Sequence, residues 1–294
     1  MENYKDLENL LDSILKVLRE DPICHIPNTP KYNQINLSAK FVAEILFGKS
    51  GFELVKFGEF GQIKFPYFEM GAITSVDLFG LDELIIFSYY WCHRSRYKRA
   101  ADLGANIGLH SILMEKCGYE VISFEPDPKT FARLEMNISL NSKNGKITPK
   151  QKAVSTENGT LEFTRVLGNT TGSHLSGAKP NPYGDLERFE VDTESFNDIM
   201  KRVDFLKVDV EGHEAAILTN TSREDWENVD AIVEIGTAEN AEQVYKHFSN
   251  IGVNMFAQKN AWERVTRISD VPVSYKQGSL FISIKDKMLW GLLE

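Results

Sequence analysis

Two glycines and a carboxylate in the middle of the chain have the spacing of a nucleoside-binding turn. The strand-like residues Ala101-Asp102-Leu103 lead into Gly104-Ala105-Asn106-Ile107-Gly108, and a helical segment follows. Glycines at such a corner let the backbone turn sharply and approach a ligand closely. Glu125 ends the next predicted strand about twenty residues later, where a carboxylate can accept hydrogen bonds from both hydroxyls of a ribose. The pattern predicts a site for a nucleoside cofactor.

The same turn departs from the Gly-x-Gly-x-x-Gly fingerprint of dinucleotide-binding folds. Asn106 occupies the position of the second glycine and Leu109 that of the third. An acid, Asp102, also stands two residues before Gly104. An NAD-dependent oxidoreductase is therefore disfavoured, although it remains an alternative.

A second group of acids follows a later predicted strand. Asp209, Glu211 and Glu214 come at the end of residues 205–210, and the carboxyl ends of parallel strands are where open α/β sheets bind ligands. Transfer of a methyl group to a hydroxyl needs one positioned base to take the proton. Asp209, Glu211 and His213 are the candidates here. The structural alternative for Glu211 and Glu214 is the first turn of a helix, where the helix dipole favours acids.

A metal site is the other interpretation of these acids. Asp209, Glu211 and Glu234 could coordinate Mg²⁺ or Ca²⁺ through oxygen. The spacing shows no complete ligand set, so no metal is predicted.

Two histidines lie in further segments that could reach a ligand. His174 belongs to a Gly-, Ser- and Thr-rich stretch, residues 168–177, that predicts a loop between strands. An imidazole with a near-neutral pKa suits proton removal, so His174 is another candidate base. His110 opens the helix after the glycine turn and is expected to touch the cofactor.

The elements that position these residues follow a regular pattern after Arg99. Short apolar segments alternate with helical ones, which favours a parallel, doubly wound α/β sheet. Two β-rich pieces near the C-terminus are separated by a long loop and predict an antiparallel last strand. Helices are also predicted at residues 7–18, ended by Asp21-Pro22, and at 81–91, whereas residues 23–75 show no clear pattern. The expected strands are 100–103, 121–124, 147–154, 205–210, 231–235, 253–258 and 280–284, and the expected helices between them are 109–117, 130–140, 214–220 and 241–251.

Three stretches resemble the FkbM family of S-adenosylmethionine-dependent methyltransferases. They are Asp102-Leu103-Gly104-Ala105-Asn106-Ile107-Gly108, then Phe124-Glu125-Pro126, and Phe205-Leu206-Lys207-Val208-Asp209-Val210-Glu211-Gly212-His213-Glu214. The resemblance covers residues 97–236. It implies a class I methyltransferase (Rossmann-like) sheet, S-adenosyl-L-methionine as cofactor, and O-methylation of a sugar, glycan or polyketide hydroxyl. Where the family often has a histidine, Glu234-Ile235-Gly236 has glycine, so a role for that histidine is not expected.

The resemblance and the strand ends together define the expected site. The backbone around Ala153 and Val154 is expected to hold the adenine ring. The expected catalytic residues are His174, Asp209, Glu211 and His213. The expected cofactor contacts are Asp102, Gly104, Ala105, Asn106, Gly108, His110, Glu125, Pro126, Ala153, Val154 and Asp209.

Composition narrows the class of protein. The chain has 294 residues and 42% hydrophobic content, enough for a methyltransferase domain over residues 97–294 and an N-terminal extension, residues 1–96, that could bind substrate or a second subunit. A formal charge of -9 disfavours a nucleic-acid partner. Three cysteines without metal or redox spacing, and no signal or membrane-spanning segment, favour a cytoplasmic enzyme.

The acceptor is expected to be a small molecule or glycan, selected by residues 1–96 and by a loop over residues 164–187. A non-catalytic adapter that binds a nucleoside remains a further alternative, because fold does not imply function. The sequence does not indicate an oligomeric state.

Overall fold

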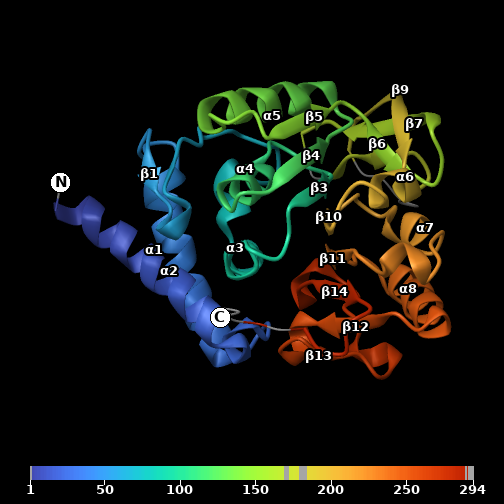
Figure 1. Cartoon of the computed structure of the whole chain (residues 1–294). Coiled ribbons are helices and arrows are strands. Elements are labelled where there is room, and N and C mark those ends of the chain that lie inside the picture. The colour runs from blue at the N-terminus through green and yellow to red at the C-terminus, as the bar shows by residue number, and fades with distance from the viewer. Residues whose placement is uncertain (1, 169–171, 179–183, 289, 291–294) are drawn as a thin grey trace.

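The centre of the molecule is an eight-stranded sheet with the order β13-β12-β14-β11-β10-β3-β4-β5. The computed structural model describes residues 2–168, 172–178, 184–288 and 290 (Figure 1). The strands are β3 (Arg99–Leu103), β4 (Glu120–Phe124), β5 (Ile147–Lys150), β10 (Phe205–Val208), β11 (Asp230–Val233), β12 (Asn254–Ala257), β13 (Glu263–Arg264) and β14 (Leu280–Ser283).

The strand directions confirm the predicted fold class. The run β5-β4-β3-β10-β11 is parallel, whereas β14 lies antiparallel between β11 and β12. The chain order reverses between β3 and β10, since β4 and β5 continue to one side and β11 to the other. Such a switch point opens a crevice at the carboxyl ends of the strands. The antiparallel closing strand is the one that the C-terminal sequence predicts.

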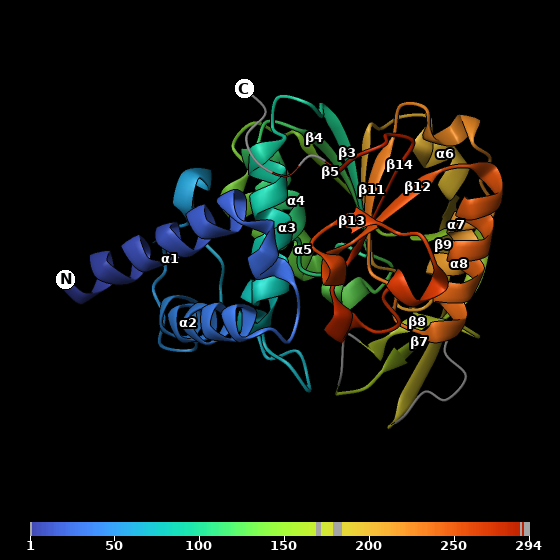
Figure 2. The same cartoon turned by 90° about the horizontal axis from the view of Figure 1, so that it is seen from below.

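Helices cover both faces of this sheet (Figure 2). One face packs on α3 (Leu81–Cys92) and α4 (Leu109–Lys116), with Ala100 and Phe205 among the buried side chains. The other face, with Ala101 and Leu206, packs on α7 (Glu214–Leu218) and α8 (Ala238–Ile251). Alternate residues of each strand therefore bury against different helices. The remaining sheet helices are α5 (Pro128–Asn141) and α6 (Phe196–Met200).

The N-terminal segment contains one helix that the sequence predicts and one that it does not. Helix α1 (Glu2–Glu20) ends before Pro22 as expected. Helix α2 (Pro30–Phe47) begins at a proline, a residue that in the sequence indicates an interruption of helical structure. Proline is favoured in the first turn because its missing N–H has no helical partner there, and Thr29 caps the helix by accepting from Tyr32 N at 3.2 Å.

The extension and the sheet share one core. Leu15 of α1, Phe87 of α3 and Phe205 of β10 belong to a single cluster of buried apolar side chains. The boundary at residue 97 thus separates two stretches of sequence that pack together, and a division into separate domains stays a prediction. No helix in the described part of the chain has both the length and the apolar composition of a membrane span.

A second, four-stranded sheet corrects two expectations. Its order is β6-β9-β7-β8, with β6 (Ala153–Ser155), β7 (Gly159–Val166), β8 (His174–Leu175) and β9 (Leu186–Ser195). The predicted single strand at 147–154 is wrong, because the chain turns at Lys152 and β5 and β6 enter different sheets. The predicted loop at 164–187 is wrong at both ends, where residues pair in the β7–β9 hairpin. Residues 169–171 and 179–183 of that segment lie outside the described part.

A buried histidine connects the N-terminal segment to the C-terminal part of the chain. The side chain of His25 is fully buried, with Nε2 2.8 Å from the Leu18 carbonyl oxygen. Its Nδ1 accepts from Trp262 Nε1 at 2.9 Å, and Trp290 Nε1 donates to the same Leu18 oxygen at 2.9 Å. This arrangement requires the neutral ring with a proton on Nε2, and burial lowers the pKa of His25 to about 4.

We predict that His25 makes stability fall with acidification. Since its folded-state pKa of about 4 lies below the ordinary 6.5, the unfolded chain takes up the proton first, and the stabilisation present above pH 6.5 is lost between pH 6.5 and 4. Between pH 7 and 5 the wild type should lose about 2 kcal/mol more unfolding free energy than His25→Gln, measured by urea denaturation. Equal pH dependence of the two proteins would contradict this role.

Candidate functional site

The glycine turn after β3 is built around a close backbone approach. Gly104 has φ +79°, and a Cβ placed there would lie 1.8 Å from the carbonyl oxygen of Asp209. Its N–H and that of Ala105 both donate to the Phe124 carbonyl, at 3.0 and 2.8 Å. Only glycine fits this position, because any side chain would collide with the segment that follows β10.

The carboxylate of Glu125, after β4, closes this turn. Its Oε2 accepts from Asn106 N at 3.0 Å, and its Oε1 accepts from Asp127 N at 2.9 Å. Each oxygen keeps a second lone pair that can accept from a ligand hydroxyl. Burial raises the pKa of Glu125 to about 8, although the two N–H donors act in the opposite direction.

A pocket opens above this turn, at the switch point of the sheet. Residues following β3, β4 and β10 form its floor, and β6, β7 and β8 of the second sheet add a wall. The lining residues are Gly104, Asn106, Phe124, Glu125, Pro126, Asp127, Thr130, Lys152, Ala153, Val154, Phe163, Ser173, His174, Leu175, Asp209, Val210 and Glu211.

The wall combines apolar side chains with one imidazole. Phe163 and Leu175 are buried register partners on β7 and β8, and both line the pocket. His174 is also buried, with Nδ1 2.8 Å from the Gly172 carbonyl oxygen. Nδ1 therefore carries the proton of the neutral ring, and Nε2 carries its lone pair.

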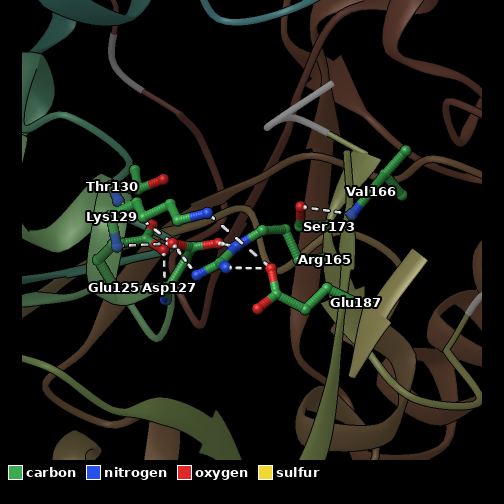
Figure 3. A network of polar contacts seen from close by, with 8 residues as sticks. All are labelled: Glu125, Asp127, Lys129, Thr130, Arg165, Val166, Ser173 and Glu187. Atoms are coloured by element: carbon green, nitrogen blue, oxygen red, sulfur yellow. Dashed lines mark hydrogen bonds and ion pairs between the residues drawn. The ribbon is translucent and has the colours of Figure 1, made fainter. Parts of the chain in front are cut away.

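An arginine fastens this wall to the cofactor side (Figure 3). Arg165 of β7 reaches Asp127 with two nitrogens, and its Nη2 lies 2.8 Å from Asp127 Oδ1. Its Nη1 donates to Glu187 Oε2 at 2.6 Å. Asp127 also caps α5 by accepting from Lys129 N at 2.8 Å. The pair Arg165–Asp127 thus links the second sheet to the residues next to Glu125.

Asp209 connects the pocket lining to a cluster of acidic residues beside the pocket, and this cluster contains one buried cation, Lys207. Lys207 Nζ donates to Asp209 Oδ2 at 3.1 Å, and Glu234 follows the adjacent strand, with its N–H donating to the Val208 carbonyl. Burial opposes the charge of Lys207, yet the carboxylates of Asp209 and its neighbours raise its pKa. Burial also raises the pKa of Glu234 well above its ordinary value. Within the described residues, no three His, Cys, Asp or Glu side chains are placed to hold a metal ion.

The turn after β10 explains why the predicted strand at 205–210 ends early. Glu211 has φ +52° and Gly212 φ +103°, so the chain leaves the sheet after Val208. Glu214 accepts from Val210 N and Gly212 N, at 3.1 and 3.0 Å. Glu214 opens α7, as its structural interpretation predicts, and its carboxylate also stabilises the preceding turn; Glu211 lies before this helix, so the same interpretation is wrong for Glu211.

Two buried oxygens near the glycine turn have no hydrogen-bond partner among the described residues. They are Asp102 Oδ1 and Asn106 Oδ1. The other oxygen of Asp102 accepts from Ser111 Oγ at 2.6 Å. Orphaned acceptors at such a site are what a ligand with N–H or O–H donors would satisfy.

The structure brings together most of the residues expected from the sequence. Among the expected catalytic residues, His174, Asp209 and Glu211 line the pocket, whereas His213 instead places Nε2 3.2 Å from Ser155 Oγ. Expected cofactor residues that line it are Gly104, Asn106, Glu125, Pro126, Ala153, Val154 and Asp209; those that do not are Asp102, Ala105, Gly108 and His110.

Sequence reasoning missed the contribution of the second sheet. Local sequence patterns did not identify Phe163, Leu175 or Arg165 as site residues. Strand β8 is only two residues long, and Asp127, the partner of Arg165, lies 38 residues away in the sequence. Asp127 caps α5, and its pairing with Arg165 is a contact that no local pattern in the sequence indicates. The one feature of the sequence that could have drawn attention to this sheet is Arg165 itself, a charged residue in a segment that otherwise resembles a strand.

Comparisons with known proteins match the chain to a methyltransferase family. The family model described as Methyltransferase FkbM domain matches residues 102–262, more than half of the chain. Methyltransferase sdnD of Sordaria araneosa is 28% identical over 167 residues, covering 45% of this chain and 63% of that protein. Hexuronic acid methyltransferase AglP of Haloferax volcanii is 30% identical over 122 residues, covering 40% of this chain and 47% of that protein. The chain thus matches less than two thirds of the length of either relative.

Solved structures also align with the chain. A SAM-dependent methyltransferase from Agrobacterium tumefaciens covers 70% of this chain and 63% of its own, with TM-score 0.38 and 9% identity. The SAH-bound methyltransferase PaMTH1 of Podospora anserina covers 69% and 79%, with TM-score 0.37 and 11% identity. The fold assignment itself rests on the strand order and directions described above.

We predict that Arg165 holds the second sheet over the pocket. Arg165→Met leaves the Asp127 carboxylate buried without its partner, which should lower the free energy of unfolding by about 3 kcal/mol. The matched control is Arg188→Met on β9, whose exposed pair with Glu162 spans 3.9 Å and should contribute little. Urea denaturation of both variants measures the difference, and equal stability would show that the buried pair is not needed.

Proposed function

Because the chain belongs to the family of FkbM-domain methyltransferases, we propose that it transfers a methyl group to a hydroxyl on a sugar, glycan or related metabolite. The observation that carries this proposal is the shared pocket of Gly104, Glu125 and Asp209 at the switch point of the sheet. There a ribose-binding carboxylate and a group able to accept a proton face one cavity.

S-adenosylmethionine is the cofactor, and when bound it supplies a methyl group activated by a positively charged sulfur. The residues present fit its parts. Glu125 would bind the ribose hydroxyls through the second lone pairs of its oxygens. Phe163, Val154 and Leu175 offer apolar surface to the adenine ring. The unpartnered Oδ1 of Asn106, which lines the pocket, would accept from the amino group.

Three of the expected catalytic residues line the pocket and could take the acceptor's proton: His174, Asp209 and Glu211. His174 contributes an imidazole, a group suited to proton removal near neutral pH. Asp209 presents a carboxylate whose Oδ2 is fixed by Lys207. His213 does not line this pocket, so we assign the base to His174, Asp209 or Glu211.

The hydroxyl acceptor is supported by chemistry and by one relative. Transfer to oxygen needs only a positioned base beside the donor, and this pocket contains carboxylate and imidazole groups. AglP carries the name of a hexuronic acid methyltransferase. A sugar-like acceptor is therefore the first class to test.

The test combines binding with transfer. Titration calorimetry should show S-adenosylmethionine binding, and incubation with a panel of oligosaccharides should give products heavier by about 14 Da, one methyl replacing one hydrogen. Glu125→Ala should weaken cofactor binding at least tenfold, about 1.4 kcal/mol, because the ribose loses its acceptor. Glu135→Ala, an exposed change on α5, is the matched control and should bind as the wild type does.

The same assay separates the three candidate bases. Whichever of His174→Ala, Asp209→Asn and Glu211→Gln removes the base should lose transfer while still binding the cofactor. Absence of S-adenosylmethionine binding by the wild type at millimolar concentration would overturn the whole proposal.

A further inference from the structure

Helix α3 precedes the segment that the family model matches. It places a carboxylate near the edge of the sheet where the carboxyl ends of the parallel strands lie. The helix runs antiparallel to the central strands: Tyr89, near its end, stacks on Phe205 at the start of β10, with ring centroids 5.9 Å apart. Its first turn therefore lies near the carboxyl ends of the strands. That turn contains Glu83, whose side chain keeps 27% exposure.

Glu83 is held in place by a hydrogen-bonded chain. His110 Nε2 lies 2.8 Å from Glu83 Oε2, and His110 Nδ1 lies 2.8 Å from the Tyr90 hydroxyl. Tyr90 is buried, and burial raises its pKa well above the ordinary value, so its hydroxyl keeps the proton and donates it to Nδ1. His110 accordingly presents Nε2–H to the Glu83 carboxylate.

Glu83 shares one face of the sheet with the charged residues that lie beside Asp209. Phe205 packs against α3, and alternation along β10 places Lys207 and then Asp209 on the same side. Asp102 is the register partner of Lys207 on β3. Within the described residues, Lys207 is therefore the one cation among the carboxylates of this cluster.

The charges of these groups influence one another. Burial disfavours the ionised form of Glu83, yet His110 and Lys207 together lower its pKa. The carboxylates of Asp209, Asp102 and Glu83 raise the pKa of Lys207. More carboxylates than cations therefore lie in this cluster beside Asp209, the member that lines the pocket, and the local field at this side of the pocket is negative.

We propose that Glu83, positioned by His110, makes the site prefer S-adenosylmethionine over its demethylated product, S-adenosylhomocysteine. This inference rests on the proposed function. The two molecules differ by one methyl group and by the positive charge on sulfur, so their affinity ratio reports the field at the sulfur atom. A negative field binds the charged donor more tightly and releases the neutral product more readily.

Calorimetric titration of both molecules tests the inference without needing an acceptor. Glu83→Gln removes one negative charge while keeping the side-chain shape. We expect the affinity ratio of donor to product to fall about three- to tenfold, with product affinity within about twofold of the wild type. Glu83→Asp keeps the charge and should retain most of the ratio.

Glu120→Gln is the matched control, because this exposed residue begins β4 at the opposite edge of the sheet. It should leave the ratio unchanged. An unchanged ratio in Glu83→Gln, an equal loss of both affinities, or the same shift in Glu120→Gln would each overturn the inference. Failure of the wild type to bind either molecule would instead contradict the proposed function.

Discussion

The contact between Gly104 and the carbonyl of Asp209 is the constraint on which the site depends. A Cβ at position 104 would lie only 1.8 Å from the Asp209 carbonyl oxygen. The segments after β3 and β10 can therefore approach each other only because residue 104 has no side chain. That approach brings the glycine turn, the carboxylate after β4 and the acids after β10 to one edge of the sheet. A wider separation would open the crevice and place Glu125 and Asp209 in different cavities.

Local sequence signals predicted this part well, because its elements are regular and the chemistry lies at strand ends. The parallel strands, the Gly104 turn, Glu125 and Asp209 were all recognisable from spacing, and β14 from its position after a long loop. The second sheet was not, because its strands depend on distant pairing, as Arg165 with Asp127 shows. Helix α2 was missed because Pro30 marks a helix start and a break alike. The identity of the base stays a prediction for the same reason: spacing shows which residues reach the edge, not which faces the acceptor.

Electrostatics divides the pocket and the charged residues beside it into two unlike halves. Around Glu125 the wall is apolar and its charges are paired, as in the bidentate contact of Arg165 with Asp127. Around Lys207 the carboxylates outnumber the cation, and one of them comes from α3 in the N-terminal extension. The first half suits a nucleoside, and the second suits a positively charged centre and a hydroxyl that must lose its proton. The extension shares a core with the sheet, and in our proposal its Glu83 also acts on the site.

The central claim is that the pocket beside Gly104 holds an adenosyl cofactor through Glu125. A crystal structure of the protein grown with S-adenosylhomocysteine tests it most directly. The account predicts the ribose hydroxyls within hydrogen-bond distance of the Glu125 carboxylate and the adenine ring against Phe163 and Leu175. A ligand bound elsewhere, or in this pocket with its ribose turned away from Glu125, would contradict it.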